Sequence, residues 1–292
     1  MNCIDQVVTD KYALYHGDCV EVLKGLPDQS VGYSIFSPPF ASLYTYSNSP
    51  RDMGNVRNDD EFFEHFDYLI KELARVIKPG RNISFHCMDM PASKERDGYI
   101  GLKDFPGELL RAFQRHGFIF HSKVTIWKDP VTAMQRTKAL GLLHKSVREN
   151  SAMCRQGIPD YLITVRSSGS CERVTHGAEF PVDLWQKVAS PVWMDINPSD
   201  TLQYTSAREH DDERHICPLQ LEVIRRGVML WTNPDDIVLS PFLGIGSEGH
   251  VSVEMGRRFV GVELKASYFQ QAVRNLATAH AKTLDLFSVE EA

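Results

Sequence analysis

Two loops that lie far apart in the sequence carry the residue types best suited to chemistry. The first is Ser37-Pro38-Pro39-Phe40, and the second runs from Pro241 to Gly246. Each follows a short apolar run that predicts a strand, so both should lie at the carboxyl edge of a sheet, where open α/β proteins bind ligands. Prolines and an aromatic ring can hold a planar group, while glycines let backbone approach a cofactor closely. Together the loops predict a cofactor beside a planar acceptor, the arrangement needed for methyl transfer to a nucleobase.

The second loop continues into a glycine-rich turn, with Glu263 at the end of the following predicted strand. Such a turn fits a dinucleotide site as well as an S-adenosylmethionine site. In both, glycines admit the cofactor, a helix N-terminus favours a negative group, and the acid accepts hydrogen bonds from ribose hydroxyls. Only about forty residues follow Gly249, so the remaining strands of a nucleotide-binding unit must come from the N-terminal part. This order disfavours a dehydrogenase.

Hydrophobic periodicity predicts the alternating elements that position these loops. We expect strands at residues 12–16, 31–36, 81–87, 118–127, 161–165, 237–240 and 259–264. We expect helices at residues 19–26, 60–77, 105–116, 218–232, 249–255 and 266–281. The pattern predicts an α/β fold with a mainly parallel sheet.

Composition limits the class of protein. The 292 residues are 42% hydrophobic, enough for a real core, and no run approaches the ~20 apolar residues that span a bilayer. The first residues lack a basic or apolar leader pattern, so we expect a cytoplasmic protein. The six cysteines show no metal-site spacing, which predicts reduced thiols and no structural metal.

A net charge of −6 means that any nucleic-acid surface must be local. Residues 123–166 form the basic stretch of this acidic chain, and an irregular stretch with several prolines and two tryptophans follows at 167–214. A basic run is often only a solvated face, but its density favours a DNA contact. The residues that we expect to contact DNA are Arg136, Lys138, Arg148, Arg155 and Gln156.

The motifs in their order resemble the beta class of DNA amino-methyltransferases, in which the catalytic loop precedes the cofactor loop. The chain looks most similar to solitary methylases of bacteria and prophages. The resemblance rests on residues 15–19, 26–31, 37–40, 75–80, 126–128, 215–218, 240–246 and 256–263.

That resemblance implies a Rossmann-like S-adenosylmethionine-dependent methyltransferase fold, circularly permuted in the beta-class order. It implies a catalytic half at residues 1–127, a DNA-contact and target recognition region at 128–213, and a cofactor-binding half at 214–292. The catalytic residues would be Ser37, Pro38, Pro39 and Phe40. The residues that it assigns to the cofactor are Asp18, His215, Ser240, Phe242, Gly244, Gly246, Ser247 and Glu263. The chain departs from the family at Ser240, where Asp is usual, at residues 245–247, where Ser-Gly-Thr is usual, and at Leu219 and Gln220, where a Lys-Pro pair is usual.

The resemblance also implies double-stranded DNA as partner, a flipped target base and a homodimer, and leaves a cognate nuclease possible. Ser37 at the first loop position is associated with cytosine N4, whereas many solitary enzymes modify adenine N6. We predict adenine N6 and keep cytosine N4 as the alternative. A DNA-binding protein that kept the fold without activity is a third hypothesis, which the intact loops and Glu263 disfavour.

Overall fold

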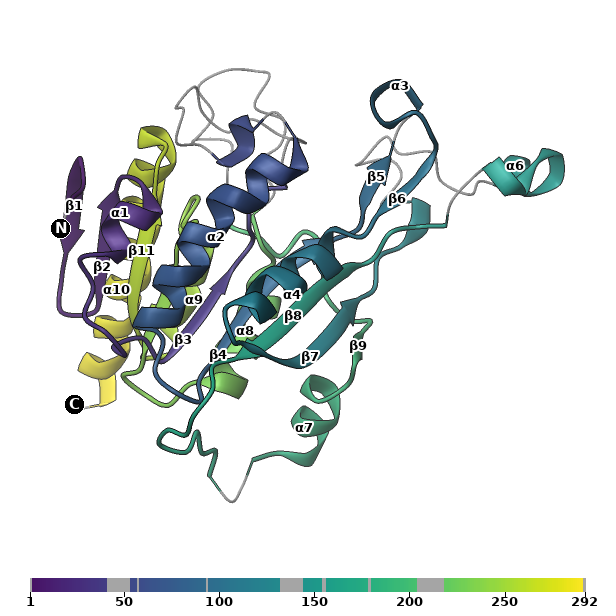
Figure 1. Cartoon of the computed structure of the whole chain (residues 1–292). Helices are drawn as coiled ribbons and strands as arrows, with labels where there is room; N and C mark the ends of the chain where they lie inside the picture. Colours follow the sequence, from purple (N-terminus) through teal and green to yellow (C-terminus); the bar gives the residue numbers. More distant parts are fainter. Residues whose placement is uncertain are drawn as a thin grey trace.

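The computed structural model describes residues 2–40, 53–56, 58–92, 94–131, 144–153, 156–177, 180–203 and 218–290. Within these residues a nine-stranded sheet has the order β1-β2-β11-β10-β3-β4-β8-β7-β9 (Figure 1). The neighbours β2, β11, β10, β3 and β4 pair in parallel, and β8 pairs antiparallel with both β4 and β7. The strands of this sheet are β1 (Asp5–Val8), β2 (Tyr12–His16), β3 (Tyr33–Phe36), β4 (Asn82–Met88), β7 (Ile119–Ile126), β8 (Asp160–Arg166), β9 (Val192–Trp193), β10 (Ile237–Ser240) and β11 (Arg258–Glu263).

Helices cover both faces of the sheet. Figure 1 shows α1, α2 and α4 in front of it and α8, α9 and α10 behind it, and each group packs into its own apolar cluster with the strands. The helices are α1 (Cys19–Leu23), α2 (Asp59–Val76), α3 (Lys94–Asp97), α4 (Phe105–Arg115), α6 (His144–Glu149), α7 (Val182–Val188), α8 (Leu221–Trp231), α9 (Ser247–Glu254) and α10 (Ala266–Glu290). Short 3₁₀ turns lie at Met53–Asn55 and Ser151–Met153.

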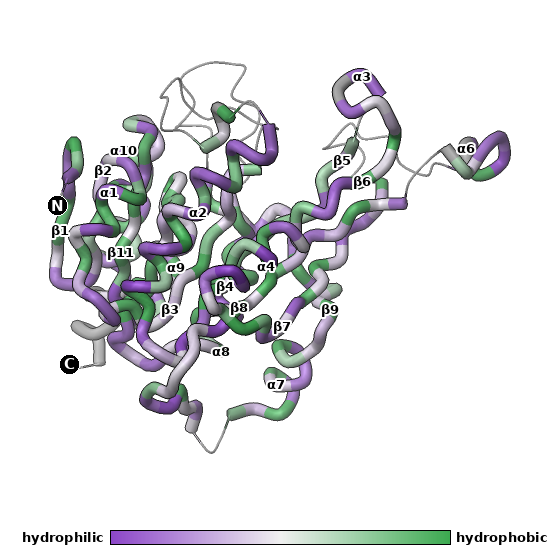
Figure 2. Tube along the Cα trace, viewed as in Figure 1, coloured by the Kyte–Doolittle hydropathy of each residue, from purple (hydrophilic) through white to green (hydrophobic). Residues whose placement is uncertain are grey.

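The helix α2 illustrates why these segments fold as they do. Its side chains Phe62, Phe66 and Leu69 recur at helical spacing and are fully buried against the sheet. Figure 2 shows hydrophobic and hydrophilic residues interspersed along this helix. The Asn58 side chain accepts a hydrogen bond from the N–H of Glu61 at 2.9 Å, which caps the first turn.

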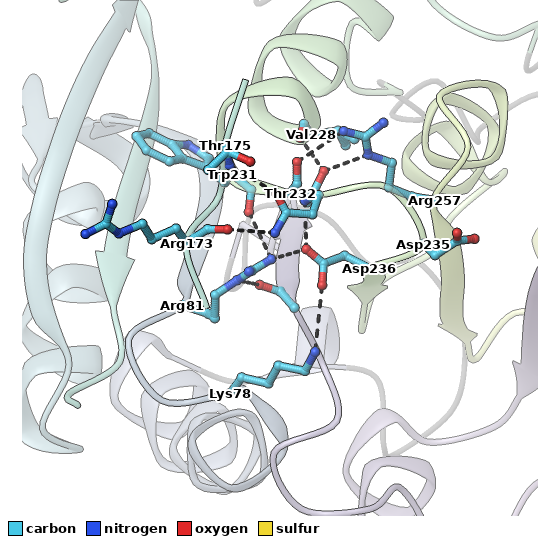
Figure 3. A network of polar contacts seen from close by, with 12 residues as sticks. Lys78, Arg81, Arg173, Thr175, Val228, Trp231, Thr232, Asp235, Asp236 and Arg257 are labelled. Atoms are coloured by element: carbon cyan, nitrogen blue, oxygen red, sulfur yellow. Dashed lines mark hydrogen bonds and ion pairs between the residues drawn. The ribbon is translucent and has the colours of Figure 1, made fainter. Parts of the chain in front are cut away.

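A buried ion-pair network holds the amino-terminal edge of the parallel strands (Figure 3). Arg81 precedes β4 and forms an ion pair with Asp236, which precedes β10. Arg81 also donates to the Gly32 carbonyl at 2.8 Å. Asp236 accepts from the N–H of Asn233 at 2.8 Å, and its other oxygen is 3.7 Å from Lys78 Nζ. The network therefore ties together the starts of three neighbouring strands, at the edge opposite the two loops.

The predicted α/β fold is confirmed, and every predicted strand and helix is present. The strands predicted at residues 12–16 and 237–240 have the predicted bounds, and the ends of the other elements are shifted. Helix α10 extends to Glu290, beyond the predicted end at residue 281. The periodicity missed β1, the short helices α3, α6 and α7, the strand β9 and the hairpin of β5 (Met90–Ala92) and β6 (Gly101–Lys103). These elements are too short to display a period, and β5 contains Pro91, a residue that disfavours a strand.

The division into three regions stays a prediction, with one observation bearing on it. Strand β8 belongs to the predicted recognition region, yet it pairs along its length with β4 and β7 of the main sheet.

Among the described residues, no helix combines the length and the apolar character that crossing a bilayer would require.

Candidate active site

The two chemistry-bearing loops leave the sheet from adjacent strands. Strands β3 and β10 pair in parallel, with Ser34 opposite Leu239. Ser37 follows the end of β3, and Pro241 follows the end of β10. Phe36, the last residue of β3, packs against Phe242 of the second loop, with their ring centroids 5.7 Å apart. Residues some two hundred positions apart in sequence therefore form one site at the carboxyl edge.

Glycines shape the cofactor loop in two different ways. Gly246 has a left-handed φ of 92°, and a Cβ there would lie 2.7 Å from Leu276 Cδ1 and 3.2 Å from Ala272, so the loop packs tightly on α10. Gly244 also has a positive φ, of 55°, but a Cβ there would meet no atom of the described residues within 4 Å. The backbone at Gly244 therefore borders open space, as a cofactor cradle requires.

Acidic side chains lie at the ends of the next two strands. Glu263 ends β11, where it is in register with His16 at the end of β2. Its carboxylate accepts from the N–H of Gly244 at 2.8 Å and from the N–H of Lys265 at 2.8 Å. Asp18 caps α1 by accepting from the N–H of Glu21 at 3.0 Å. The N–H of Gly17 donates to the Glu263 carbonyl at 2.9 Å, so the two acids are held on adjoining segments.

Two serine hydroxyls beside the cofactor loop are buried. Ser240 is fully buried and Ser247 is 3% exposed, and neither Oγ has a hydrogen-bond partner among the described residues. A buried polar atom without a partner is costly. The pair therefore indicates a site that a polar ligand completes.

Glu248, next to Ser247, was not among the predicted site residues. It is 5% exposed, and burial raises the pKa of its carboxyl to about 8, with the nearby charge of Glu263 acting in the same direction. The side chain is consequently mostly protonated at neutral pH and can donate a hydrogen bond. A glutamate within a glycine-rich turn gave no sign of this raised pKa in the sequence, because the pKa shift depends on burial.

The catalytic loop is only partly exposed. Pro38 is buried, whereas Ser37, Pro39 and Phe40 are half-buried. The Phe40 ring centroid is 6.1 Å from that of Phe105, at the start of α4. Ser37 Oγ is 3.1 Å from His86 Nδ1 on β4. His86 lacks any motif of its own, so the sequence gave no signal for this contact.

Several predicted DNA contacts lie outside the described residues, namely Arg136, Lys138 and Arg155, as does the predicted cofactor residue His215. Arg148 is exposed on α6, and Gln156 is exposed beyond it. Figure 1 shows α6 beyond the β5–β6 hairpin, away from the body of the sheet. This placement leaves both described side chains accessible to a large partner.

Two lysines of the basic stretch are engaged within the protein. Lys123 Nζ lies 3.8 Å from the centroid of the Tyr161 ring. Lys128 Nζ lies 2.5 Å from Asp160 Oδ1. The basic stretch therefore offers fewer accessible cations than its composition suggests. Within the part of the chain that the structure describes, no cluster of three or more His, Cys, Asp or Glu could hold a metal ion.

Known proteins resemble this chain along most of its length. The Type II methyltransferase M1.MboII of Moraxella bovis is 38% identical over 281 residues, covering 89% of this chain and 94% of that protein. The DNA adenine methyltransferase YhdJ of Escherichia coli is 25% identical over 287 residues, covering 95% of this chain and 87% of that protein.

Solved structures share the fold. The Thermus thermophilus protein TTHA0409, in its complex with S-adenosyl-L-methionine, aligns with a TM-score of 0.67 at 22% identity, covering 92% of this chain and 96% of that one. The cytosine-N4-specific PvuII DNA methyltransferase aligns with a TM-score of 0.66 at 16% identity, covering 97% of each chain. The predicted Rossmann-like methyltransferase fold is thereby confirmed. The family model for DNA methylases of the N6 and N4 type matches residues 33–274, and this chain belongs to that family.

Proposed function

We propose that this protein transfers a methyl group from S-adenosylmethionine to the exocyclic N6 of adenine in duplex DNA. One observation carries the proposal: the Ser37–Phe40 loop and the Phe242–Gly246 loop leave adjacent parallel strands and lie at one edge of the sheet. Membership of the DNA methylase family supports the reaction class. The similarity to an adenine methyltransferase, YhdJ, across 95% of this chain supports the target base.

The residues present fit the proposed cofactor. S-adenosylmethionine, when bound, supplies an electrophilic methyl group on a sulfonium. The open space at Gly244 gives the cofactor room against the backbone. The unpartnered Ser240 and Ser247 hydroxyls suit its polar amino acid end. Glu263 and Asp18, at the ends of neighbouring segments, would offer carboxylate acceptors to its ribose and adenine, the roles that the family resemblance implies.

The catalytic loop addresses the chemical difficulty of the reaction. An exocyclic amino nitrogen is a poor nucleophile because its lone pair is delocalised into the ring. Ser37 Oγ and the Pro38 carbonyl would accept hydrogen bonds from its two N–H groups, which favours a tetrahedral nitrogen and aims the lone pair at the methyl. Pro39 would stiffen the loop, and Phe40 would stack on the base. The acceleration comes from positioning and fixed dipoles, without a covalent intermediate.

The target base must leave the duplex before it reaches this loop, since its amino group is otherwise paired and stacked. The accessible Arg148 and Gln156, with the other predicted contacts, would hold the DNA during this step. Arginine suits phosphate or guanine, and glutamine suits adenine. A homodimer stays a prediction from the family resemblance.

Cytosine N4 is the second candidate target. Its specific support is Ser37 at the first loop position, together with the shared fold of the cytosine-N4-specific PvuII enzyme. Both bases present an exocyclic amino group with the same two donors, so the loop geometry suits either one.

The product identifies the base. Duplex DNA is incubated with the protein and isotopically labelled S-adenosylmethionine, digested to nucleosides and analysed by mass. We expect labelled N6-methyldeoxyadenosine. Labelled N4-methyldeoxycytidine would replace adenine by cytosine as the target. DNA binding with no labelled nucleoside would favour the inactive DNA-binding alternative, and a parallel cofactor titration would show whether the cradle binds S-adenosylmethionine at all.

A further inference from the structure

Ser37 begins a row of polar side chains that runs into the sheet. Ser37 Oγ is 3.1 Å from His86 Nδ1, and His86 Nε2 is 3.1 Å from Asp160 Oδ2. The second carboxylate oxygen, Asp160 Oδ1, is 2.5 Å from Lys128 Nζ. The proposed function gives no role to the last three residues of this row.

Strand register brings the four residues together. Phe36 of β3 is in register with Phe85 of β4, so the residues that follow them, Ser37 and His86, lie side by side. Antiparallel β8 places Asp160 opposite Met88 of β4 and opposite Ile126 of β7. Lys128 follows two residues after the end of β7. The row is therefore fixed by backbone pairing within the sheet.

Asp160 supplies the negative charge of the row. It is 2% exposed, and a carboxylate buried to that degree must be paired. Burial alone would raise the pKa of Asp160, but the contacts with His86 and Lys128 outweigh it and hold the pKa below its ordinary value. Asp160 is therefore ionised at neutral pH and favours a proton on the ring nitrogen that faces it.

The contact between His86 Nε2 and Asp160 is close but bent. At 3.1 Å the atoms are within ion-pair distance, although the ring N–H does not point along the line required for a regular hydrogen bond. The attraction is mainly electrostatic. It still favours the tautomer with hydrogen on Nε2, because the alternative would set a lone pair against a carboxylate.

We propose that His86 is a positioning residue that makes Ser37 a hydrogen-bond acceptor toward the target amino group. When hydrogen is on Nε2 alone, Nδ1 has only a lone pair, so Ser37 must donate its single proton to it. The lone pairs of Ser37 Oγ are then left for an N–H of the base. In the other tautomer Ser37 would accept from Nδ1, and its own proton would be free to face that N–H.

Donation to His86 also strengthens the acceptor. A hydroxyl that donates a hydrogen bond becomes a better acceptor, because the two bonds polarise one another. Asp160 and Lys128 thus act on the base only through His86 and Ser37. The inference rests on the proposed function, since the acceptor is assigned to the amino group that is methylated.

Two substitutions at one position separate the roles of the two ring nitrogens. The side-chain amide of His86→Asn can place an acceptor near the position of Nδ1, facing Ser37. His86→Gln places its amide near the position of Nε2, facing Asp160. We expect His86→Asn to keep most of the single-turnover methylation rate and His86→Gln to lose about tenfold, the effect of one neutral hydrogen bond. Equal rates in the two variants, or the reverse order, would overturn the proposal.

A matched control and a background variant sharpen the comparison. His116 Nε2 also contacts an aspartate, Asp67 Oδ1, at 2.9 Å, but it lies at the end of α4. His116→Asn should leave the rate unchanged. In a Ser37→Ala background, His86→Gln should cause no further loss, whereas an additional tenfold loss would mean that His86 acts independently of Ser37.

A measurement without activity tests the same tautomer. Nitrogen NMR of the whole protein, labelled at its histidine rings and assigned with His86→Asn, reads the protonation of each ring nitrogen. We expect Nδ1 of His86 unprotonated and Nε2 protonated at neutral pH, with the Nδ1 signal shifted in Ser37→Ala. A proton on Nδ1 would overturn the inference even in an active enzyme. Absence of any methylated product from the wild-type protein would instead refute the proposed function, and the NMR result would still decide the tautomer.

Discussion

The N–H of Gly244 donates to Glu263 Oε2 at 2.8 Å, and this bond joins the cofactor loop to the end of β11. The other carboxylate oxygen accepts from the N–H of Lys265 at 2.8 Å. Each carboxylate oxygen has more than one lone pair, so Glu263 can hold the loop and accept a ribose hydroxyl at the same time. One side chain therefore both shapes the cradle and offers acceptors to the cofactor.

Glu263→Ala should weaken S-adenosylmethionine binding by about 1 to 3 kcal/mol, because acceptors for the ribose and for two backbone N–H groups are removed together. Calorimetric titration of the cofactor measures the change. Glu254→Ala is the control, since Glu254 ends α9 and contacts His250 at 3.1 Å rather than the loop. Unchanged affinity in Glu263→Ala would contradict the assignment of Glu263 to the cofactor.

Ser37→Ala should separate chemistry from cofactor binding. The hydroxyl contacts His86 and, in the proposed reaction, the target amino group, so its loss should lower the single-turnover methylation rate by about tenfold or more. Cofactor affinity should stay near the wild-type value. Ser30→Ala provides the control, because that hydroxyl donates to the Pro27 carbonyl at 2.8 Å, before β3 rather than after it. A joint collapse of affinity and rate would show that Ser37 belongs to the cofactor site.

The arrangement of the two loops was predictable from sequence because each depends on local pattern. Apolar runs before Ser37 and Pro241 identified β3 and β10, and a loop that follows a strand of an open α/β sheet lies at its carboxyl edge. The glycines were informative as well, since a positive φ such as that of Gly246 favours this residue.

The partners of Ser37 could not be predicted in the same way. His86, Asp160 and Lys128 come from three strands or the segments beside them, and their meeting depends on register between segments separated by more than thirty residues. A histidine in an apolar strand reads as a core residue until its neighbours are known. The raised pKa of Glu248 was equally hidden, because it follows from the burial created when α9 packs against α8, α10 and the sheet.

Substitutions at the adjacent residues Asp236 and Asp235 should lower the free energy of unfolding by very different amounts. Asp236→Asn removes the charge that pairs with Arg81, whose side chain is 3% exposed, and leaves that buried guanidinium without its carboxylate partner. We expect a decrease of about 3 to 5 kcal/mol in the free energy of unfolding. Asp235→Asn removes the exposed pair with Lys11 at 3.5 Å, worth about 1 kcal/mol or less. Urea unfolding measures both, and equal decreases would refute the structural role of the network in Figure 3.

The buried carboxyl of Glu248 should make stability depend on pH. Its folded pKa of about 8 lies above the ordinary value of 4.5, so the unfolded chain releases this proton at lower pH than the folded protein does. The contribution of Glu248 is therefore most favourable below pH 4.5 and is lost as the pH rises toward 8. Glu248→Gln should match the wild type near pH 4.5 and become progressively more stable than it up to pH 8, by about a few kcal/mol. A difference between the two unfolding curves that stays constant with pH would contradict this.

The predicted DNA contacts can be tested by comparing two quadruple variants, each of which neutralises four basic residues. Neutralising Arg136, Lys138, Arg148 and Arg155 together should abolish tight duplex binding, because a protein of net charge −6 depends on local cations to replace phosphate counterions. The salt dependence should flatten by about one unit of slope for each phosphate that the variant no longer neutralises. Cofactor affinity should not change. The control neutralises four exposed residues on or directly after helices that pack on the sheet, away from α6: Lys24, Lys71, Arg115 and Lys282.

Both variants change the net charge equally, so a general electrostatic effect would weaken DNA binding to the same extent in each. Weakening confined to the first set would assign DNA binding to the predicted contacts, of which Arg148 is exposed on α6. Gln156→Ala then tests base reading, since removing a side chain that reads a base should relax preference at one position of the site while leaving the salt slope unchanged. Wild-type affinity and slope in the first quadruple variant would mean that the basic stretch is a solvated face. Recognition would then have to lie within residues 167–214, and scanning substitutions in that region would be the next measurement.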